Sequence, residues 1–427
     1  MNVRAMSSSE TWLAALRDPQ AWAKTSDIVA ALIALSLPWS TTLVGIFVVV
    51  WLIALIPTID PKAMLALLKR PICIFPVALF VLAVVGTLWS DAVWGERFHT
   101  MGQATKLLAL PLLLYHYQRS TRGMWVFTAF LVSCSVLMVA SWIVAFDPAL
   151  ALKANANRGI IVKNYIDQSQ EFVLCAVVLA FPVVTLLRAS RIVPALLLSA
   201  LALSFVVNMA FVIVSRTALV TMPIMLVVFA LIHLRWRSIV IIACAIAVFA
   251  GIAWATSPQL RQTIGSFSQQ YSEYKEKGAV TSVGERLEFW RKSLLFFSEA
   301  PLVGHGTGST RGLFEQAAAG QTGVSAEVIG NPHNQTLNVA VQWGVIGVVL
   351  LYAMWLTHLL LFRGDDLAAW IGLMVVVQNI FTSLFNSHIF DFNEGWMYVL
   401  GVGVAGGMLL KAFPRDAVPE RAGPLKS

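Results

Sequence analysis

Long apolar runs joined by short polar connections constrain this sequence more than any other feature. Each run approaches the length of about 20 residues that an α-helix needs to cross the hydrocarbon core of a bilayer. Only 12% of the 427 residues are charged, whereas soluble globular chains are about 25% charged. The sequence therefore predicts an all-α polytopic membrane protein with about 12 transmembrane helices.

The apolar runs differ in how clearly each predicts a single span. Pro38-Trp39-Ser40 either separates the first two runs into a re-entrant pair or kinks one longer helix. The fourth run is short and carries Lys106, so it is either a full span or partly interfacial. The runs lie at 27–39, 41–58, 71–89, 104–117, 123–146, 169–188, 192–214, 217–234, 238–256, 336–361, 367–385 and 395–412.

Lysine and arginine residues gather at alternate connections and predict the orientation of the chain. Cytoplasmic connections carry an excess of these residues, and the pattern is consistent if an odd number of spans precedes the polar segment 257–338. Both termini then lie in the cytoplasm of a bacterial inner membrane, with the polar segment in the periplasm. The net charge of +8 follows this pattern, so no nucleic-acid partner is predicted. The predicted organisation is N-terminal transmembrane helices at 1–256, a large periplasmic loop at 257–335, C-terminal transmembrane helices at 336–412 and a cytoplasmic tail at 413–427.

The polar segment 257–338 carries helix signals between two groups of apolar runs. Loops longer than about 15 residues are usually functional or disordered. Ser257-Pro258 combines a capping residue with proline at the first helical position, and amphipathic spacing follows. The sequence 282–285 reads as a capping box for a second helix, which Pro301 ends. The segment is therefore predicted to be folded and functional.

A glycine-rich run, Gly304-His305-Gly306-Thr307-Gly308, follows the second helix. Glycine-rich loops can cradle phosphate, but the P-loop pattern requires a Lys-Ser/Thr pair that does not follow here. The run therefore favours a tight turn over a phosphate site.

His333 stands in the stretch Asn331-Pro332-His333-Asn334, which opens the next apolar run. With Asn331 as the cap and Pro332 at the first helical position, His333 falls in the first turn. The positive end of a helix disfavours imidazolium, so His333 is predicted to be neutral and able to accept a proton. The alternative is a capping histidine without chemistry. Polar side chains that continue down one face and indicate a cavity are Gln335, Asn338 and Gln342.

Arg216 occupies an unusual position for a basic residue, directly between two apolar runs. In the predicted orientation it lies at the outer edge of the membrane, where the positive-inside rule disfavours arginine. An arginine held there indicates an anionic partner. The alternative is a snorkelling arginine, whose stem lies along apolar surface while its head reaches water.

Two further outside connections carry polar and charged residues that either line the same cleft or form solvated loops. The first spans 147–168 and includes Arg158, Lys163, Asn164, Tyr165 and Asp167. The last includes Asn386, His388, Asp391, Asn393 and Glu394. The candidate substrate-binding residues are Asn334, Asn338, Arg158, Lys163 and Asp391.

Four motifs together resemble the O-antigen ligase and polymerase superfamily. They are Ser215-Arg216-Thr217 at the end of a span, Glu285-Arg286 with Trp290, the turn at 304–308, and His333-Asn334 with Leu337 and Gly344. The resemblance covers most of the chain in topology, while the motifs themselves lie within 216–347.

This resemblance implies a type-C membrane glycosyltransferase that takes a glycan from undecaprenyl pyrophosphate on the periplasmic side. It implies that Arg216, Arg286 and His333 are the catalytic residues, and that neither a cofactor nor a metal takes part. The sequence has no Asp-x-Asp motif at a span end. Arginine forks suit the charge that develops on a pyrophosphate leaving group, and a neutral imidazole can deprotonate an attacking hydroxyl.

The members of the superfamily differ in their acceptor. Ligases transfer the glycan to a sugar hydroxyl of lipid A–core, polymerases to another lipid-linked repeat unit, and other relatives to proteins. One dominant outside loop favours the ligase, and the short tail after Leu410 disfavours a protein glycosyltransferase. The alternative from another class is a transporter or flippase, which predicts broken helices in matching halves and charges near mid-membrane. The charges here gather instead at the outer face.

Overall fold

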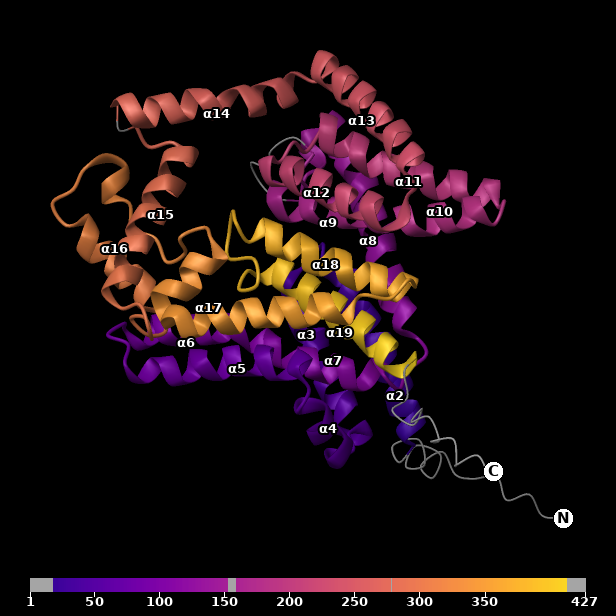
Figure 1. Ribbon diagram of the computed structural model, residues 1–427, viewed down its shortest axis with the longest axis horizontal. Helices are drawn as coiled ribbons and strands as arrows, with labels where there is room; N and C mark the ends of the chain where they lie inside the picture. Colours follow the sequence, from indigo (N-terminus) through magenta and orange to yellow (C-terminus); the bar gives the residue numbers. More distant parts are fainter. Residues whose placement is uncertain (1–17, 153–158, 278, 413–427) are drawn as a thin grey trace, which may run out of the picture.

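The structure is a computed structural model that describes residues 18–152, 159–277 and 279–412 (Figure 1). Helices account for all of the regular secondary structure in these three ranges. Large apolar side chains such as Ile53, Leu197 and Val248 are exposed on the surface. Extensive exposed apolar surface is rare on soluble monomers, so the predicted all-α polytopic membrane protein is confirmed.

Eight helices within the described ranges are long and apolar enough to cross a membrane. Short 3₁₀ turns extend two of them, to Thr58 and Leu88, and α9 and α10 together form another. The eight are α3 (Thr41–Leu55), α5 (Pro71–Val85), α8 (Gly123–Phe146), α9 (Tyr165–Val178) with α10 (Ala180–Arg188), α11 (Ile192–Phe211), α12 (Arg216–His233), α13 (Trp236–Thr256) and α17 (Gln335–Leu361).

The four other predicted spans correspond to shorter or more polar helices. The first is α2 (Pro19–Ser36), which is separate from α3 because the chain turns at 37–40 and the Ser40 hydroxyl caps α3. The remaining three contain α7 (Ala109–Tyr117), the shorter apolar α18 (Leu367–Thr382), and α19 (Phe392–Ala412). A separate helix, α6 (Trp94–Ala104), precedes α7 and is joined to it by a 3₁₀ turn. The short α4 (Pro61–Leu68) connects α3 to α5. A total of about 12 spans stays a prediction.

The core lies where α17, α18 and α19 pack against α5, α7 and α9 (Figure 1). By contrast, only 6% of the apolar stretch of α13 is buried inside the protein. A helix that is apolar all round and unburied in water would be unstable, whereas lipid can cover it. We therefore expect α13 to face lipid along most of its length.

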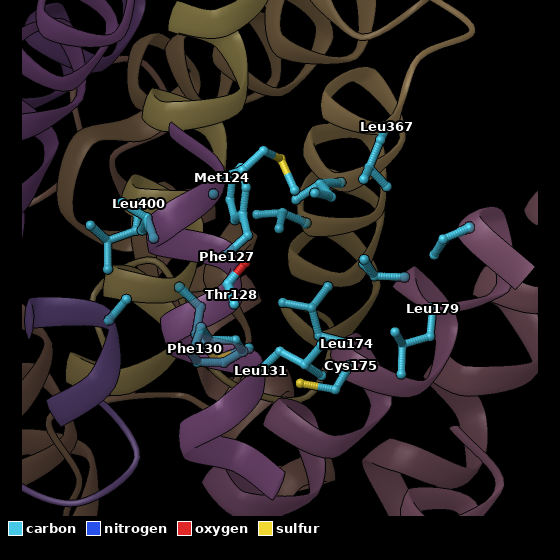
Figure 2. Close-up of a pocket in the computed structure, with 18 of the residues that line it drawn as sticks. Met124, Phe127, Thr128, Phe130, Leu131, Leu174, Cys175, Leu179, Leu367 and Leu400 are labelled. Atoms are coloured by element: carbon cyan, nitrogen blue, oxygen red, sulfur yellow. The ribbon is translucent and has the colours of Figure 1, made fainter. Parts of the chain in front are cut away.

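An apolar cavity of about 230 Å³ lies between α8, α9, α18 and α19 (Figure 2). Its walls are almost entirely hydrocarbon, with side chains such as Phe127, Leu174, Leu367 and Leu400 pointing inward. A cavity of this composition offers no charged group for phosphate chemistry.

The polar segment folds into helices at one end of the bundle, opposite the C-terminal end of α19 (Figure 1). The helices are α14 (Pro258–Lys277), α15 (Ser282–Glu299) and α16 (Ser309–Ala318). As predicted, α14 starts after Ser257, whose hydroxyl accepts from the Leu260 amide at 3.2 Å. The second cap differs from the prediction, because Thr281 rather than Ser282 accepts from the Gly284 amide.

The glycine-rich run forms the predicted tight turn, with positive φ at Gly304, Gly306 and Gly308. It packs against a break in α17 at Gly344, where φ is +60°. The break leaves carbonyls of α17 free, and the amides of His305 and Gly306 donate to two of them. A Cβ on Gly304 would lie 2.4 Å from the backbone of Gln342. The turn therefore anchors the polar segment to α17 by close backbone contact.

We predict that α14 and the connection between α17 and α18 lie on opposite sides of the membrane. Cysteine placed at the exposed Gln269 should react with an impermeant maleimide in intact spheroplasts. Cysteine at the exposed Asp365 is the matched control and should react only after the membrane is opened. Cys244 is first replaced by serine because it is exposed and would itself react with the maleimide. The other three cysteines are buried and can stay. Labelling of position 269 only from the cytoplasmic side would contradict the orientation.

Candidate active site

Arg216 and Arg286 lie in one cavity of about 480 Å³, which we call the arginine cavity. Arg216 is the first residue of α12, and Arg286 lies in the first turns of α15. The remaining walls come from α14 and from Tyr165 at the start of α9. Among the described residues that line this cavity, none is a carboxylate. Two cations in a cavity without acidic side chains make it a site for an anion.

Hydrogen bonds to α14 and α15 hold the Arg216 guanidinium in place. It donates to the hydroxyls of Ser266 at 2.8 Å and Ser282 at 2.9 Å, and to Gln270 Oε1 at 3.1 Å. The guanidinium carbon also lies 4.6 Å from the centre of the Phe267 ring. All of these partners are neutral, so Arg216 keeps its full charge toward the cavity. The side chain is fixed by folded protein, which argues against the snorkelling alternative.

Arg286 is half-buried and forms no hydrogen bond or ion pair with the described residues. Burial lowers the pKa of its guanidinium below the ordinary value, and the positive charge of Arg216 acts in the same direction. An unpaired guanidinium that is partly removed from water is destabilised until an anion pairs with it. The five donors of arginine match the oxygens of a phosphate in a fork geometry.

His333 lies just before α17, rather than in its first turn as predicted. Asn334, not Asn331, is the cap of α17, and its side chain accepts from the Leu337 amide at 3.1 Å. The Asn331 side chain instead accepts from the backbone amide of His333 at 3.0 Å. His333 has a left-handed φ of +52°, which costs about 1 kcal/mol for a residue with a Cβ. Strained residues of this kind cluster at active sites.

The imidazole of His333 is fixed by a chain of two hydrogen bonds. Its Nδ1 lies 2.9 Å from Asn386 Oδ1, and Asn386 Nδ2 donates to Asp391 Oδ2 at 2.6 Å. Because Asn386 presents an oxygen, Nδ1 carries the proton and donates, which leaves the lone pair on Nε2. Asn386 Oδ1 also accepts from Asn331, so its orientation is set from both sides.

His333 is held in its neutral form. Burial lowers the pKa of the imidazole, and the positive charges of Arg286 and His388 lower it further, although the bond to Asn386 acts in the opposite direction. The lowered pKa agrees with the predicted neutral form, and its main cause is burial rather than the helix dipole. The His333 ring also lies 6.1 Å from the ring of Phe289, which belongs to α15, the helix that carries Arg286. The two arginines thus share one cavity, and His333 contacts the helix that carries one of them, while the catalytic roles of all three stay predictions.

Residues 201–352 match a family model that is described as O-antigen ligase. The chain matches the O-antigen ligase family over this range. The matched range contains Arg216, Arg286 and His333, and it confirms the resemblance to the O-antigen ligase and polymerase superfamily.

An uncharacterized protein of Haemophilus influenzae (strain ATCC 51907 / DSM 11121 / KW20 / Rd) is also similar. It is 28% identical over 130 residues, which cover 30% of this chain and 33% of that protein. The similarity thus spans about a third of the length of the relative.

The remaining predicted substrate-binding residues have different positions around the O-antigen ligase motifs. Asn334 caps α17, and Asn338 donates to Ser387 Oγ at 3.0 Å. Lys163 donates to Asn393 Oδ1 at 2.6 Å and to the Leu37 carbonyl, so it contacts α19 and α2. Asp391 ends the chain of hydrogen bonds from His333. Arg158 lies outside the described residues.

Asp391 also belongs to a group of three residues that could hold a metal ion, together with His388 and Glu394. Their potential ligand atoms all lie within 4.8 Å of one another. Burial raises the pKa of Asp391 to about 6. Burial alone would lower the pKa of His388, but the carboxylates of Glu394 and Asp391 raise it overall. His388 Nδ1 lies 3.6 Å from Glu394 Oε1. A protonated His388 paired with these carboxylates accounts for the arrangement, and a chelator experiment tests the metal directly.

Sequence reasoning missed the partners that orient the O-antigen ligase motifs. Ser266 and Gln270 belong to the polar face of the predicted amphipathic helix, and their spacing of four places them on one side. That spacing was the available signal for a polar contact. Asn386 was visible as one of several polar residues in the last connection, without a specific role.

Proposed function

We propose that the protein transfers O-antigen glycan from undecaprenyl pyrophosphate to a sugar hydroxyl of lipid A–core at the periplasmic face of the inner membrane. The observation that carries this proposal is the pairing of Arg216 and Arg286 in one cavity whose described lining has no carboxylate, with a half-buried His333 of lowered pKa that contacts the same helix as Arg286. A lipid pyrophosphate supplies the anion that the two arginines lack. The family match over 201–352 supports the same class of reaction.

In this reaction the acceptor hydroxyl attacks the anomeric carbon of the donor sugar. A new C–O bond forms as the bond from that carbon to the pyrophosphate oxygen breaks, and in-line attack inverts the anomeric centre. The proton of the hydroxyl passes to Nε2 of His333, and undecaprenyl pyrophosphate leaves with the bonding electrons. Arg216 and Arg286 stabilise the negative charge that grows on the leaving group.

Asn386 and Asp391 keep His333 ready for this step. The proton on Nδ1 is held by Asn386, so the lone pair on Nε2 is available to the acceptor. Asp391 in turn fixes the amide so that its oxygen faces the ring. The arrangement resembles the way a carboxylate fixes the histidine of a hydrolase triad, here with an amide between the two.

The ligase reaction is proposed over the polymerase reaction on the basis of the single dominant polar segment, α14 to α16. A polymerase would use a second lipid-linked repeat unit as its acceptor. Both reactions use the same leaving group, so the arginines and His333 keep the same roles in either.

We expect purified protein in detergent to join undecaprenyl pyrophosphate-linked O-antigen to lipid A–core without any ion gradient. The product is an elongated glycolipid, detected by gel shift and mass spectrometry. Activity should persist in excess EDTA, because the two arginines can stabilise the leaving group in place of a metal.

Three results would contradict parts of this proposal. No product without a gradient would favour a transporter. Longer lipid-linked chains from the donor alone would identify a polymerase. Loss of activity in EDTA that Mg²⁺ or Mn²⁺ restores would place a cation in the reaction, with His388, Asp391 and Glu394 as its candidate ligands.

A further inference from the structure

A second polar cavity, of about 490 Å³, is lined in part by residues that hold His333. We call it the α6 cavity, because one wall is the helix α6. The opposite walls come from α16, from the N-terminal half of α17 and from the connection before α19. Its lining residues include Glu96, Thr100, Gln103, Thr310, Arg311, Asn331, Asn338, Gln342 and Asp391.

The α6 cavity is linked to His333 through Asn331 and Asp391, which both line it. Asn331 accepts from the backbone amide of His333, and its own amide donates to Asn386 Oδ1 at 2.9 Å. Asp391 accepts from the same Asn386, which holds the His333 ring. The residues that hold the imidazole therefore also form part of the wall of this cavity.

The lining of the α6 cavity differs in chemistry from the arginine cavity. Amides and hydroxyls predominate, the charge of Arg311 is offset by Glu96, 3.6 Å away, and the carboxyl group of Asp391 accepts a hydrogen bond from Asn386. Gln342 accepts from the Gly308 amide at 2.7 Å and donates to Asn338 at 2.9 Å, which fixes the amides in the wall. Fixed amides and hydroxyls recognise neutral ligands rich in hydroxyl groups, such as sugars.

The wall of this cavity contains a hydroxyl group without a hydrogen-bond partner, that of Thr310. Its side chain is 2% exposed and lines the cavity, yet its hydroxyl has no hydrogen-bond partner among the described residues. A buried hydroxyl without a partner is unfavourable. A ligand hydroxyl in the cavity would satisfy it.

The outer face of α6 indicates how such a ligand is anchored. Trp94 and Phe98 lie on one face of the helix and are 60% and 59% exposed. Glu96, Thr100 and Gln103 lie on the opposite face and line the cavity. A helix with one apolar exposed face and one polar face is suited to the surface of a bilayer. A sugar that enters the cavity past α6 can therefore remain attached to a lipid.

We propose that the α6 cavity binds the acceptor sugar of a membrane glycolipid, while the arginine cavity binds the donor pyrophosphate. This inference rests on the proposed glycosyl transfer. Much of the acceptor site then comes from α6, which lies outside the matched range 201–352. His333, which is hydrogen-bonded to the wall of the α6 cavity through Asn331, can take the proton of the acceptor hydroxyl.

The first test replaces Thr310 by valine, which keeps the shape and removes the hydroxyl. We expect the KM for lipid A–core to rise about fivefold, as for one lost hydrogen bond, while the KM for the donor stays unchanged. Ser309→Ala is the matched control, because the Ser309 hydroxyl is also buried without a partner but does not line the cavity. A rise in the donor KM, or equal effects of both variants, would overturn the assignment.

The second test measures binding without turnover, so it separates this inference from the proposed function. A photo-crosslinking residue at Gln103 should capture purified lipid A–core in the absence of donor. The same residue at Gln262, in the arginine cavity, should capture the undecaprenyl pyrophosphate donor instead. Capture at Gln103 by a protein that fails to transfer would reject the proposed function and keep the site. Transfer without capture of lipid A–core at Gln103 would reject the site and keep the function.

Discussion

Replacing Arg286 by alanine is expected to lower glycan transfer by about 10²–10³-fold, the usual effect of removing one donor that stabilises a developing anion. Its guanidinium lines the arginine cavity, is half-buried and has no partner among the described residues, so a bound pyrophosphate would be its natural counterion. Arg216→Ala is expected to show a loss of similar size. The measurement is the initial rate of transfer from the lipid-linked donor by purified, correctly inserted protein.

Lysine variants test whether geometry matters in addition to charge. Lysine keeps the positive charge but lacks the planar fork that binds two phosphate oxygens at once. Arg286→Lys is therefore expected to recover little activity. Near-normal rates in the lysine variants at both positions would reject the fork model and leave a general electrostatic role.

The two arginines differ in what their loss does to the fold. Arg216 connects α12 to α14 and α15 through three hydrogen bonds, so its variants are compared by melting temperature as well as by rate. Arg291 is the matched control for Arg286 on the same helix. It is 62% exposed and pairs with Glu288 at 2.7 Å, away from the cavity. Arg291→Ala should leave transfer nearly unchanged.

Local signals in the sequence predicted most helices and singled out Arg216 and His333, whereas Arg286 was named by the family resemblance. Ser257-Pro258 gave the start of α14 correctly, because a cap acts through bonds to amides only two or three residues away. The same reasoning placed His333 in a helical turn, and there it was wrong. Asn331 and Asn334 are both good caps, and the choice between them depends on Asn386 and Ser387, which lie more than fifty residues later.

The break in α17 could not be predicted from the apolar pattern. The run 336–361 reads as one continuous helix, and Gly344 within it costs only about 1 kcal/mol relative to alanine. The break arises because the turn at 304–308 supplies hydrogen bonds to the carbonyls that it frees. Long-range contacts of this kind set the position of the polar segment, and a single sequence does not contain them.

The pairing of the arginines was predicted, but the means of holding them was not. Arg216 was identified because its position opposes the positive-inside rule, which is a property of one residue and its neighbours. Its hydrogen-bond partners Ser266, Gln270 and Ser282 are ordinary polar residues of the polar segment. They gain a role only when α14 and α15 fold back over the start of α12.

His333→Ala is expected to lower the transfer rate by about 10²–10⁴-fold, the usual contribution of a positioned general base. Binding of the lipid-linked donor should be retained, since the arginine cavity does not depend on the imidazole. His333→Gln keeps a hydrogen-bonding group without basicity, and should be nearly as slow as the alanine variant. The rates are measured with saturating donor and acceptor.

The pH dependence separates a base from a residue that only binds substrate. A general base must be neutral, so the rate should fall as the pH drops through the pKa of His333. Because burial lowers this pKa, the acidic limb should lie below the ordinary imidazole range. The limb should vanish in His333→Gln. A variant that keeps both the limb and a substantial rate would show that the base lies elsewhere.

Asn386→Ala supplies the sharpest check on this assignment. The bond from Nδ1 to Asn386 raises the pKa of His333, so its loss should move the acidic limb to still lower pH. The rate on the plateau should also fall, because the ring is no longer held with Nε2 free. A purely structural role for Asn386 would lower the rate or the amount of folded protein without moving the limb.

The other nearby histidines are poor candidates for the base, because His305 binds the Phe296 carbonyl at 2.8 Å and His388 is enclosed with Glu394 and Asp391. Movement of the limb in Asn386→Ala, together with its disappearance in His333→Gln, would assign the base to Nε2 of His333.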